Sequence, residues 1–418
     1  MSSDSARSAN GAEVAPVGFP YIFTLTLFSV GTSSVSFCAN QVLPATLKQF
    51  TDSTFLIGFI VALQALNQLW VTPYAAWKSD RIWTRIGRRK PLVLIMTPLL
   101  ALTVGLVPHI PSLWLLVALV FILQMAEDAE LAVMMPSISD SVPDRQRPLA
   151  TGMYQFMLAA SAFAMGRFAM KLMDRSEHWP YTIAAITVVV TGLIYLRVMR
   201  ERYVPPRPRE RFRLFAYGRD ICRTREHLLI YVICFFQPLF VLVSSSFFVL
   251  LATKQMGMTN AQYGAALSWG SLTTLIICPP LGWLFIRWRH RKAVAMGCCI
   301  FAVVPMTWGL FFMRTPTDMA VFFAMQQFAF SVFRLNFFPL IMEYTTPENV
   351  ATILGFTTAV NGMVRFTMIP LAGLLVDLAG KNYSLPLWGG YLGAAVCVAA
   401  FALMRPAETV DFPHHPTI

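Results

Sequence analysis

Apolar runs of about the length of a membrane-spanning helix recur along nearly the whole chain, separated by short polar segments. A helix that crosses the hydrocarbon core of a bilayer needs about 20 predominantly apolar residues. The pattern therefore predicts an all-α polytopic membrane protein with twelve transmembrane helices. The predicted spans lie near residues 19–43, 54–78, 91–109, 112–136, 149–172, 179–198, 227–251, 261–286, 293–312, 318–342, 350–376 and 386–404.

The longest predicted loop divides these spans into six and six. It is rich in arginine, and Pro205, Pro206 and Pro208 prevent a continuous helix there. The loop lies either on the membrane surface, with its arginines at the lipid headgroups, or in solvent as a simple linker. The predicted organisation is a polar tail (1–18), a six-helix bundle (19–198), a basic linker (199–226), a second six-helix bundle (227–404) and a tail (405–418).

The two halves repeat each other weakly. Residues 71–81 (VTPYAAWKSDR) align with residues 277–287 (ICPPLGWLFIR), and residues 135–143 echo residues 338–347, which pairs Asp140 with Glu343. Internal symmetry of this kind is typical of membrane transporters built from structural repeats. It predicts two pseudo-symmetric halves, although apolar sequences also align by chance.

Composition and charge support the membrane assignment. The chain is 56% hydrophobic and 13% charged, whereas about a quarter of a soluble protein is charged. Most of the 33 Lys and Arg residues fall in alternate loops, which predicts cytoplasmic N- and C-termini in a multi-pass plasma membrane protein. This distribution also argues against nucleic acid as a partner, despite the net charge of +12.

Several classes of chemistry lack a basis in the sequence. The N-terminus has no basic segment before a short apolar core, so no cleaved signal peptide is expected. The seven cysteines lie mostly in apolar runs without a CxxC pair, which predicts neither a disulfide framework nor a metal site. A P-loop and a Ser/His/Asp constellation are also missing from the sequence. We therefore expect no cofactor and no enzymatic activity.

A basic hairpin, PYAAWKSDRIWTRIGRRKP (73–91), joins the second and third predicted spans. Asp80 is its only acid among six bases, and Gly87 permits a turn that a Cβ would hinder. The segment resembles the loop between the second and third helices of the major facilitator superfamily. Its longer spacing, SDRxxxRxGRRxP, is similar to that of the glycoside–pentoside–hexuronide:cation symporters and the related sucrose transporters.

This resemblance implies the major facilitator fold and a secondary active transporter that works by alternating access. The implied substrate is a sugar or glycoside, carried in symport with a proton or other cation. Gating roles are implied for the residues of the hairpin and for the acid at the end of the fourth span: Asp80, Arg81, Gly87, Arg88, Arg89 and Asp140. Two alternatives remain at this point, an exporter of amphipathic compounds on the same fold and a non-transporting membrane sensor or scramblase.

The fourth predicted span carries the acids of LQMAEDAEL. Glu127, Asp128 and Glu130 fall on one helical face with Gln124, at 100° per residue. Burial and like charge both favour protonation of such a cluster, so these three acids are the predicted proton-coupling residues. The structural alternative is permanent pairing with an arginine of a neighbouring helix.

Polar side chains inside other spans are the predicted substrate ligands, because ionisable groups at membrane depth are costly and usually functional. Arg365 follows Thr357, Thr358 and Asn361 on one face, and Arg334 is expected to meet the acids across a central cavity. Amides form paired hydrogen bonds with sugar hydroxyls. The predicted substrate-binding residues are Asn40, Gln64, Gln237, Gln327, Arg334, Asn361 and Arg365. The expected partners are a small-molecule substrate, a coupling cation and membrane lipids, and we expect a monomer.

Overall fold

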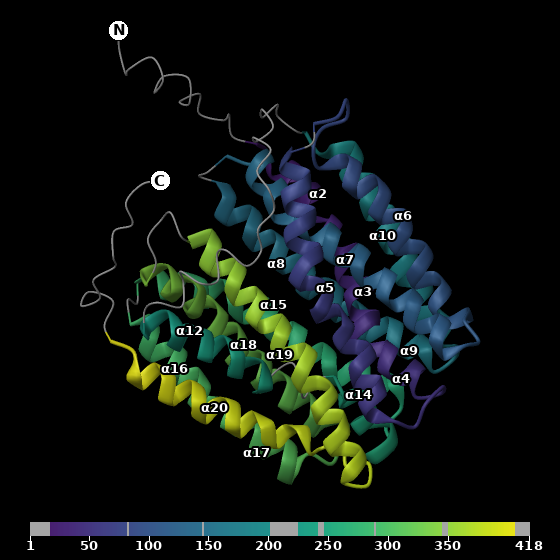
Figure 1. Ribbon diagram of the computed structural model, residues 1–418, viewed down its shortest axis with the longest axis vertical. Helices are drawn as coiled ribbons and strands as arrows, with labels where there is room; N and C mark the ends of the chain where they lie inside the picture. Colours follow the sequence, from purple (N-terminus) through teal and green to yellow (C-terminus); the bar gives the residue numbers. More distant parts are fainter. Residues whose placement is uncertain are drawn as a thin grey trace.

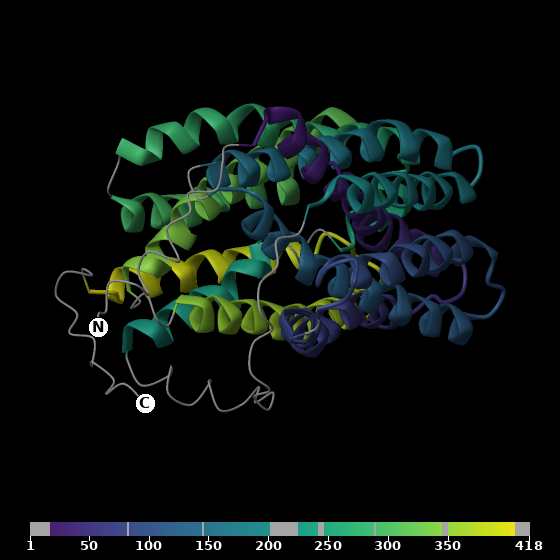
Figure 2. The same cartoon turned by 90° about the horizontal axis from the view of Figure 1, so that it is seen from above.

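The computed structural model describes residues 17–81, 83–143, 146–200, 225–240, 246–287, 290–344 and 350–405. In this part of the chain the regular secondary structure is helical, apart from an isolated bridge between Thr84 and Gly87. The helices form two groups, a first half up to residue 200 and a second half from residue 225, which lie side by side with their helices running in the same general direction (Figures 1 and 2).

The first half begins with a composite helix that contains a π-helical turn. Its elements are α2 (Phe19–Thr26), α3 (Phe28–Phe37), η1 (Cys38–Val42), α4 (Leu43–Leu47), α5 (Thr54–Arg81), α6 (Lys90–Leu106), η2 (Val107–His109), α7 (Leu113–Ser141), α8 (Arg147–Ala164), η4 (Met165–Ala169), α9 (Met170–Met173) and α10 (His178–Val198). A π-helical turn inserts one residue into the helical ladder and often marks a functional position. The η1 turn contains Asn40.

The second half follows the same plan. Its elements are α12 (Arg225–Phe236), η5 (Gln237–Phe240), α14 (Phe248–Leu250), η6 (Leu251–Gln255), α15 (Asn260–Arg287), α16 (Arg291–Phe301), α17 (Val303–Thr307), η7 (Trp308–Phe312), α18 (Pro316–Glu343), α19 (Val350–Leu378) and α20 (Pro386–Leu403). The predicted seventh span is interrupted at Gln237, where α12 gives way to a 3-10 turn. Pro238 supplies the reason, since it lacks the N–H that an α-helix needs.

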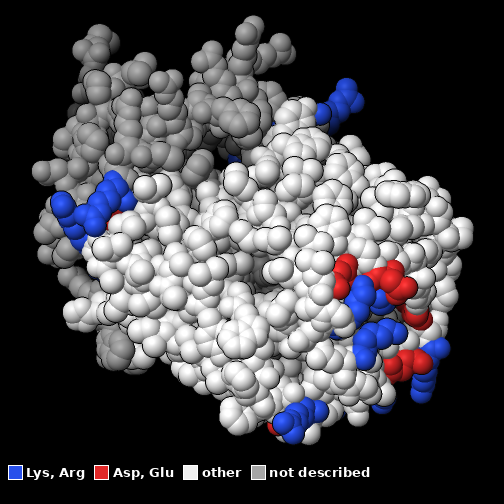
Figure 3. Space-filling model, turned by 60° about the horizontal axis from the view of Figure 1, so that its bottom comes forward, with Lys and Arg blue, Asp and Glu red and all other residues white. Residues whose placement is uncertain are grey.

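Nine helical segments of the described chain are long and apolar enough to cross a membrane. The helices that fall outside this group include α7, which carries the acid cluster, and α18. The all-helical membrane fold is thus confirmed, while the count of twelve spans stays a prediction. Charged side chains gather at the two ends of the molecule and leave an uncharged flank between them (Figure 3). This distribution suits a protein whose flank contacts lipid.

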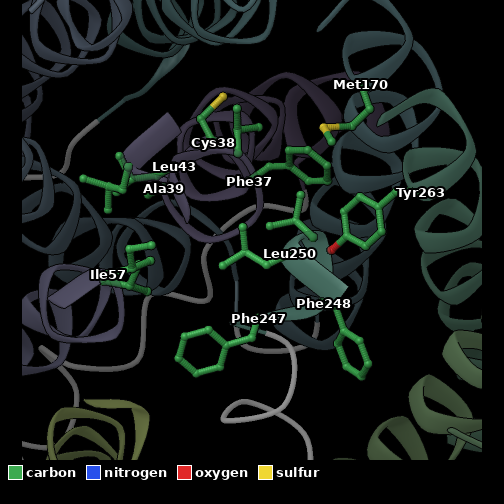
Figure 4. Packing of buried hydrophobic residues seen from close by; sticks show 14 of the residues in the cluster. Phe37, Cys38, Ala39, Leu43, Ile57, Met170, Phe247, Phe248, Leu250 and Tyr263 are labelled. Carbon is green, nitrogen blue, oxygen red and sulfur yellow. The ribbon is translucent and has the colours of Figure 1, made fainter. Parts of the chain in front are cut away.

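The two ends of the bundle differ in how the halves pack. We call the end with the 83–90 hairpin the motif end, and the end with the loops at 48–53, 174–177, 256–259 and 379–385 the far end. At the far end one apolar core joins the halves, with Phe37 and Ile57 packed in the same cluster as Phe247, Phe248 and Tyr263 (Figure 4).

At the motif end each half has a core of its own. Phe28 and Tyr195 belong to the core of the first half, and Phe333 and Phe401 to that of the second. A shared core holds the halves together through buried apolar area, at about 25 cal/mol per Å². Among the residues that the structure describes, the apolar core shared by the two halves therefore lies at the far end.

Candidate functional site

Arg365 lies in the middle of α19 and reaches from the second half into the first. Its Nη2 donates to Asn40 Oδ1 at 3.3 Å and to Gln64 Oε1 at 3.2 Å. Asn40 comes from η1 and Gln64 from α5. The predicted ligands Asn40, Gln64 and Arg365 thus meet at one point between the halves, with Asn361 one turn before Arg365 on the same helix.

Two acids of α7 complete this centre. Glu127 and Asp128 are buried, and both are close enough to Arg365 for electrostatic attraction. Ser36 Oγ donates to Glu127 Oε1 at 2.5 Å. The amides of Gln64 and Gln68 lie beside Glu127 and Asp128 respectively, without well-formed hydrogen bonds. Gln64 therefore stands between the guanidinium and the first acid.

No direct ion pair joins Arg365 to either acid among the described residues, and several buried polar atoms of this region have no hydrogen-bond partner. They are Glu127 Oε2, both carboxylate oxygens of Asp128, Gln124 Oε1, Asn67 Oδ1, Asn361 Oδ1 and Arg365 Nε. Buried polar groups are nearly always paired, so a group of unpaired atoms calls for an explanation. Six of these seven atoms are carboxylate or amide oxygens, so the region has an excess of hydrogen-bond acceptors. Protons on the acids, or hydroxyl groups of a bound molecule, supply the kind of donor that such atoms need.

Glu130 faces a different neighbour. It is buried, and its Oε1 accepts a hydrogen bond from Thr97 Oγ1 of α6 at 2.7 Å. The sequence placed the three acids on one face, but at 100° per residue Asp128 and Glu130 are far apart on the helix circumference. The structure accordingly directs Asp128 toward α5 and Glu130 toward α6.

The remaining predicted ligands lie in the second half. Arg334 is largely exposed and lies over the Phe330 ring, 5.6 Å from its centre. Among the described contacts, Arg365 and not Arg334 is the arginine that interacts with the acids. Gln237 is buried in η5 with Nε2 unpaired, and Gln327 is half-buried beside Gly270.

The hairpin of the motif end forms the predicted turn. Gly87 has φ 118°, and Thr84 N donates to its carbonyl at 3.0 Å while Gly87 N donates back at 3.1 Å. An Arg89 guanidinium N–H donates to the Ser79 hydroxyl, while Arg88 lies half-buried in the hairpin just before α6. The side chains of Asp80, Arg81 and Asp140 lie outside the described part of the structure, so their gating roles stay predictions.

The second half shows a pair at the position equivalent to Asp140. Arg291 Nη1, at the start of α16, lies 2.8 Å from Glu343 Oε1, at the end of α18. Glu343 is the residue that the sequence repeat aligned with Asp140. The pair is partly exposed and contributes about 0–1 kcal/mol to stability.

Sequence reasoning did not single out Ser36 and Thr97, the hydroxyl partners of Glu127 and Glu130. Both residues lie in apolar spans, where a serine or threonine commonly bonds its own helix backbone. Ser36 lies four residues before Asn40, whose Nδ2 donates to the Ser36 carbonyl at 2.9 Å. A polar pair spaced by one helical turn was the available signal.

The fold and the site define a class: a helical membrane protein with two similar halves around a buried polar centre. The sequence profile of the Major Facilitator Superfamily matches residues 22–256 and again residues 239–415, and the chain belongs to this superfamily. The family and the similar solved structures make it a secondary transporter. No curated protein matches the chain.

Solved structures of transporters share the fold at low sequence identity. A POT family transporter in complex with 5-aminolevulinic acid has a TM-score of 0.74 at 11% identity, covering 91% of this chain and 96% of its own. A POT family transporter with a thioalcohol-conjugated peptide has 0.73 at 10% identity, covering 90% and 94%. The nucleoside transporter NupG has 0.72 at 12% identity, covering 91% and 99%.

Proposed function

We propose that this protein is a proton-coupled symporter of a hydroxyl-rich solute, a sugar or glycoside, with the centre around Arg365 as its binding and coupling site. The observation that carries the proposal is the contact of Arg365 with Asn40 and Gln64, next to two buried acids with unpaired oxygens. A guanidinium and primary amides offer fixed donors and acceptors of the kind that sugar hydroxyls match in pairs.

The chemistry of the site favours a polar cargo over an amphipathic one. An exporter of amphipathic compounds needs a mainly apolar and aromatic surface, whereas the groups that converge here are charged or amide side chains. The likeness to a nucleoside transporter is compatible with this choice, because a nucleoside carries a sugar. The resemblance of the basic hairpin to sugar and glycoside symporters supports the same substrate class.

Proton binding and substrate binding are coupled because the two acids and the substrate compete for Arg365. When Glu127 and Asp128 are ionised, they attract the guanidinium and hold its side chain toward α7. Protonation of one acid weakens that attraction and frees Arg365 to bind substrate. Gln64 transmits the change, because it contacts Arg365 through Oε1 and lies beside Glu127. Proton and substrate therefore bind together and are released together.

The shared core at the far end corresponds to one state of alternating access. With the motif end on the cytoplasmic side, as the arginine distribution of the loops predicts, this state is closed to the outside. The transporter then operates in the plasma membrane by closing the motif end and opening the far end.

Reconstituted transport tests the proposal. The purified protein in proteoliposomes is assayed for uptake of a panel of labelled sugars and glycosides, with and without an inward proton gradient. We expect at least one sugar to accumulate with the gradient and to equilibrate when an uncoupler is added. Parallel assays with amphipathic dyes serve as the comparison. Movement of a dye but of no sugar would contradict the proposal.

A further inference from the structure

Two long helices begin at the far end, α5 in the first half and α15 in the second. The N-terminal amides of a helix lack partners within the helix and carry a partial positive charge. For the third amide of each helix the partner is local. Leu56 N donates to Ser53 Oγ at 3.2 Å, and Gln262 N donates to Thr259 Oγ1 at 3.2 Å.

The first two amides of each helix bind an aspartate of the opposite half. Thr54 N and Phe55 N of α5 donate to the two carboxylate oxygens of Asp377 at 2.9 and 3.0 Å, and Asp377 belongs to α19. Asn260 N and Ala261 N of α15 donate to the two oxygens of Asp174 at 3.0 and 2.9 Å, and Asp174 follows α9. Each half therefore caps a helix of the other.

The two caps are equivalent in the sequence repeat. The offset that aligns Val71 with Ile277 also aligns Ser53 with Thr259. The offset that aligns Asp140 with Glu343 also aligns Asp174 with Asp377. Donor helix, local cap and carboxylate thus recur together, and the repeat places both caps at the same end of the molecule.

Glycines allow the capped helices to approach. A Cβ on Gly264 of α15 would lie 2.2 Å from the carbonyl oxygen of Gly166, and a Cβ on Gly373 of α19 would lie 2.4 Å from that of Thr54. These distances are too short for any other residue without movement of the backbone. We call the contact of α5 with α19 the α5–α19 seam, and the contact of α8, η4 and α9 with α15 the α8–α15 seam.

We propose that Asp174 and Asp377 are gating residues that form a reciprocal lock. Their two helix caps together hold the far end closed, and each cap forms only while both seams are closed. Opening of the far end separates each aspartate from the helix of the other half and exposes four backbone amides and two carboxylates to water. Because the halves move as units, loss of one cap weakens the other seam as well. The inference depends on alternating access and not on the identity of the substrate or the coupling ion.

Hydrogen–deuterium exchange on the full-length protein in proteoliposomes, without substrate, tests the lock. The amides of residues 54–55 and 260–261 are followed in Asp377→Ala and in Asp174→Ala. We expect each variant to speed exchange at both helix starts, by about tenfold for a cap of ordinary strength. Asp318→Ala is the matched control, because Asp318 accepts from Arg314 N and Thr315 N within the second half alone. It should leave both helix starts unchanged.

A purely local cap gives a different result: each variant then speeds exchange only at the helix that it caps, and this outcome overturns the lock. If an alanine variant does not fold, Asp377→Asn or Asp174→Asn replaces it, since asparagine keeps one acceptor oxygen. Spin labels at the exposed positions 171 and 317, one in each half, provide a second readout. The lock predicts a longer-distance population in both cap variants, and an unchanged distance contradicts it.

Discussion

The α5–α19 seam and the α8–α15 seam are related by the sequence repeat, yet they differ in chemistry at mid-depth. In the first, Arg365 meets Gln64 across the halves. The repeat offsets align Arg365 with Ala162 and Gln64 with Gly270, so the second seam has small residues at the equivalent positions. There Ser268 Oγ donates to the Phe163 carbonyl at 3.2 Å, close to the contact between Gly166 and Gly264.

The difference indicates that the two related interfaces have different roles. Close backbone packing in the α8–α15 seam gives a contact that depends on shape. Buried charge in the α5–α19 seam gives a contact whose strength depends on protonation and on a bound ligand. In the function that we propose, the α8–α15 seam is a passive contact and the α5–α19 seam is where proton binding is coupled to movement.

Arg365 should give the largest effect. Arg365→Ala leaves Glu127 and Asp128 without their cation, and we expect at least about 100-fold slower transport, since breaking a buried charged contact costs about 3–5 kcal/mol. Arg365→Lys should weaken substrate affinity, because an ammonium cannot reproduce the two-point geometry of a guanidinium. Affinity and rate are measured by concentration-dependent uptake. Unchanged affinity in both variants removes Arg365 from the binding site.

The acids should separate coupling from movement. In Asp128→Asn and Glu127→Gln we expect accumulation against a gradient to be lost while exchange of substrate across the membrane continues. Glu130→Gln is the comparison, because Glu130 contacts Thr97 and not the Arg365 centre. It should retain accumulation. If all three variants accumulate substrate normally, the cluster is structural.

Glycine substitutions test the close packing of the α8–α15 seam. Gly264→Ala places a methyl group 2.2 Å from a backbone oxygen of the other half, so we expect about tenfold slower transport and a more open far end. Gly58→Ala is the equivalent change in the α5–α19 seam, where the nearest backbone oxygen lies at 3.0 Å. A smaller effect is expected there. Equal effects of both substitutions would argue against a special dependence of the α8–α15 seam on close packing.

Lys381 should give the smallest effect. Its Nζ lies 2.6 Å from Asp377 Oδ1 and it also bonds the Asp52 carbonyl, but the lysine is half exposed. Exposed ion pairs contribute about 0–1 kcal/mol. Lys381→Ala should therefore slow transport by no more than about fivefold, as measured by initial uptake rates. A loss as large as that of Arg365→Ala would place the lock's strength in the ion pair and not in the helix cap.

The sequence predicted the elements whose signal is local. The helical character of the spans and the turn at Gly87 each depend on a few neighbouring residues, and the structure agrees with both. Arg365, Asn40 and Gln64 were three of the seven predicted substrate ligands, chosen because polar residues at membrane depth are usually functional, and the structure brings these three together.

Contacts between distant elements could not be derived in the same way. A helical face does not tell which neighbouring helix it meets, so the contact of Glu130 with Thr97 was not foreseen. To predict the caps at Asp174 and Asp377, one must know which segments meet across the halves. The repeat already contained their equivalence, but two aspartates near helix ends have no distinctive local pattern.

Substrate-driven proton movement directly tests proton coupling at the Arg365 centre. The transported sugar is added to proteoliposomes without any imposed gradient, and the external pH is recorded with a sensitive electrode. We expect a rise of external pH on sugar addition in the wild-type protein, with no rise in a Glu127→Gln/Asp128→Asn double variant that still exchanges sugar. Sugar uptake without any change of pH in the wild-type protein would contradict coupling at the Arg365 centre.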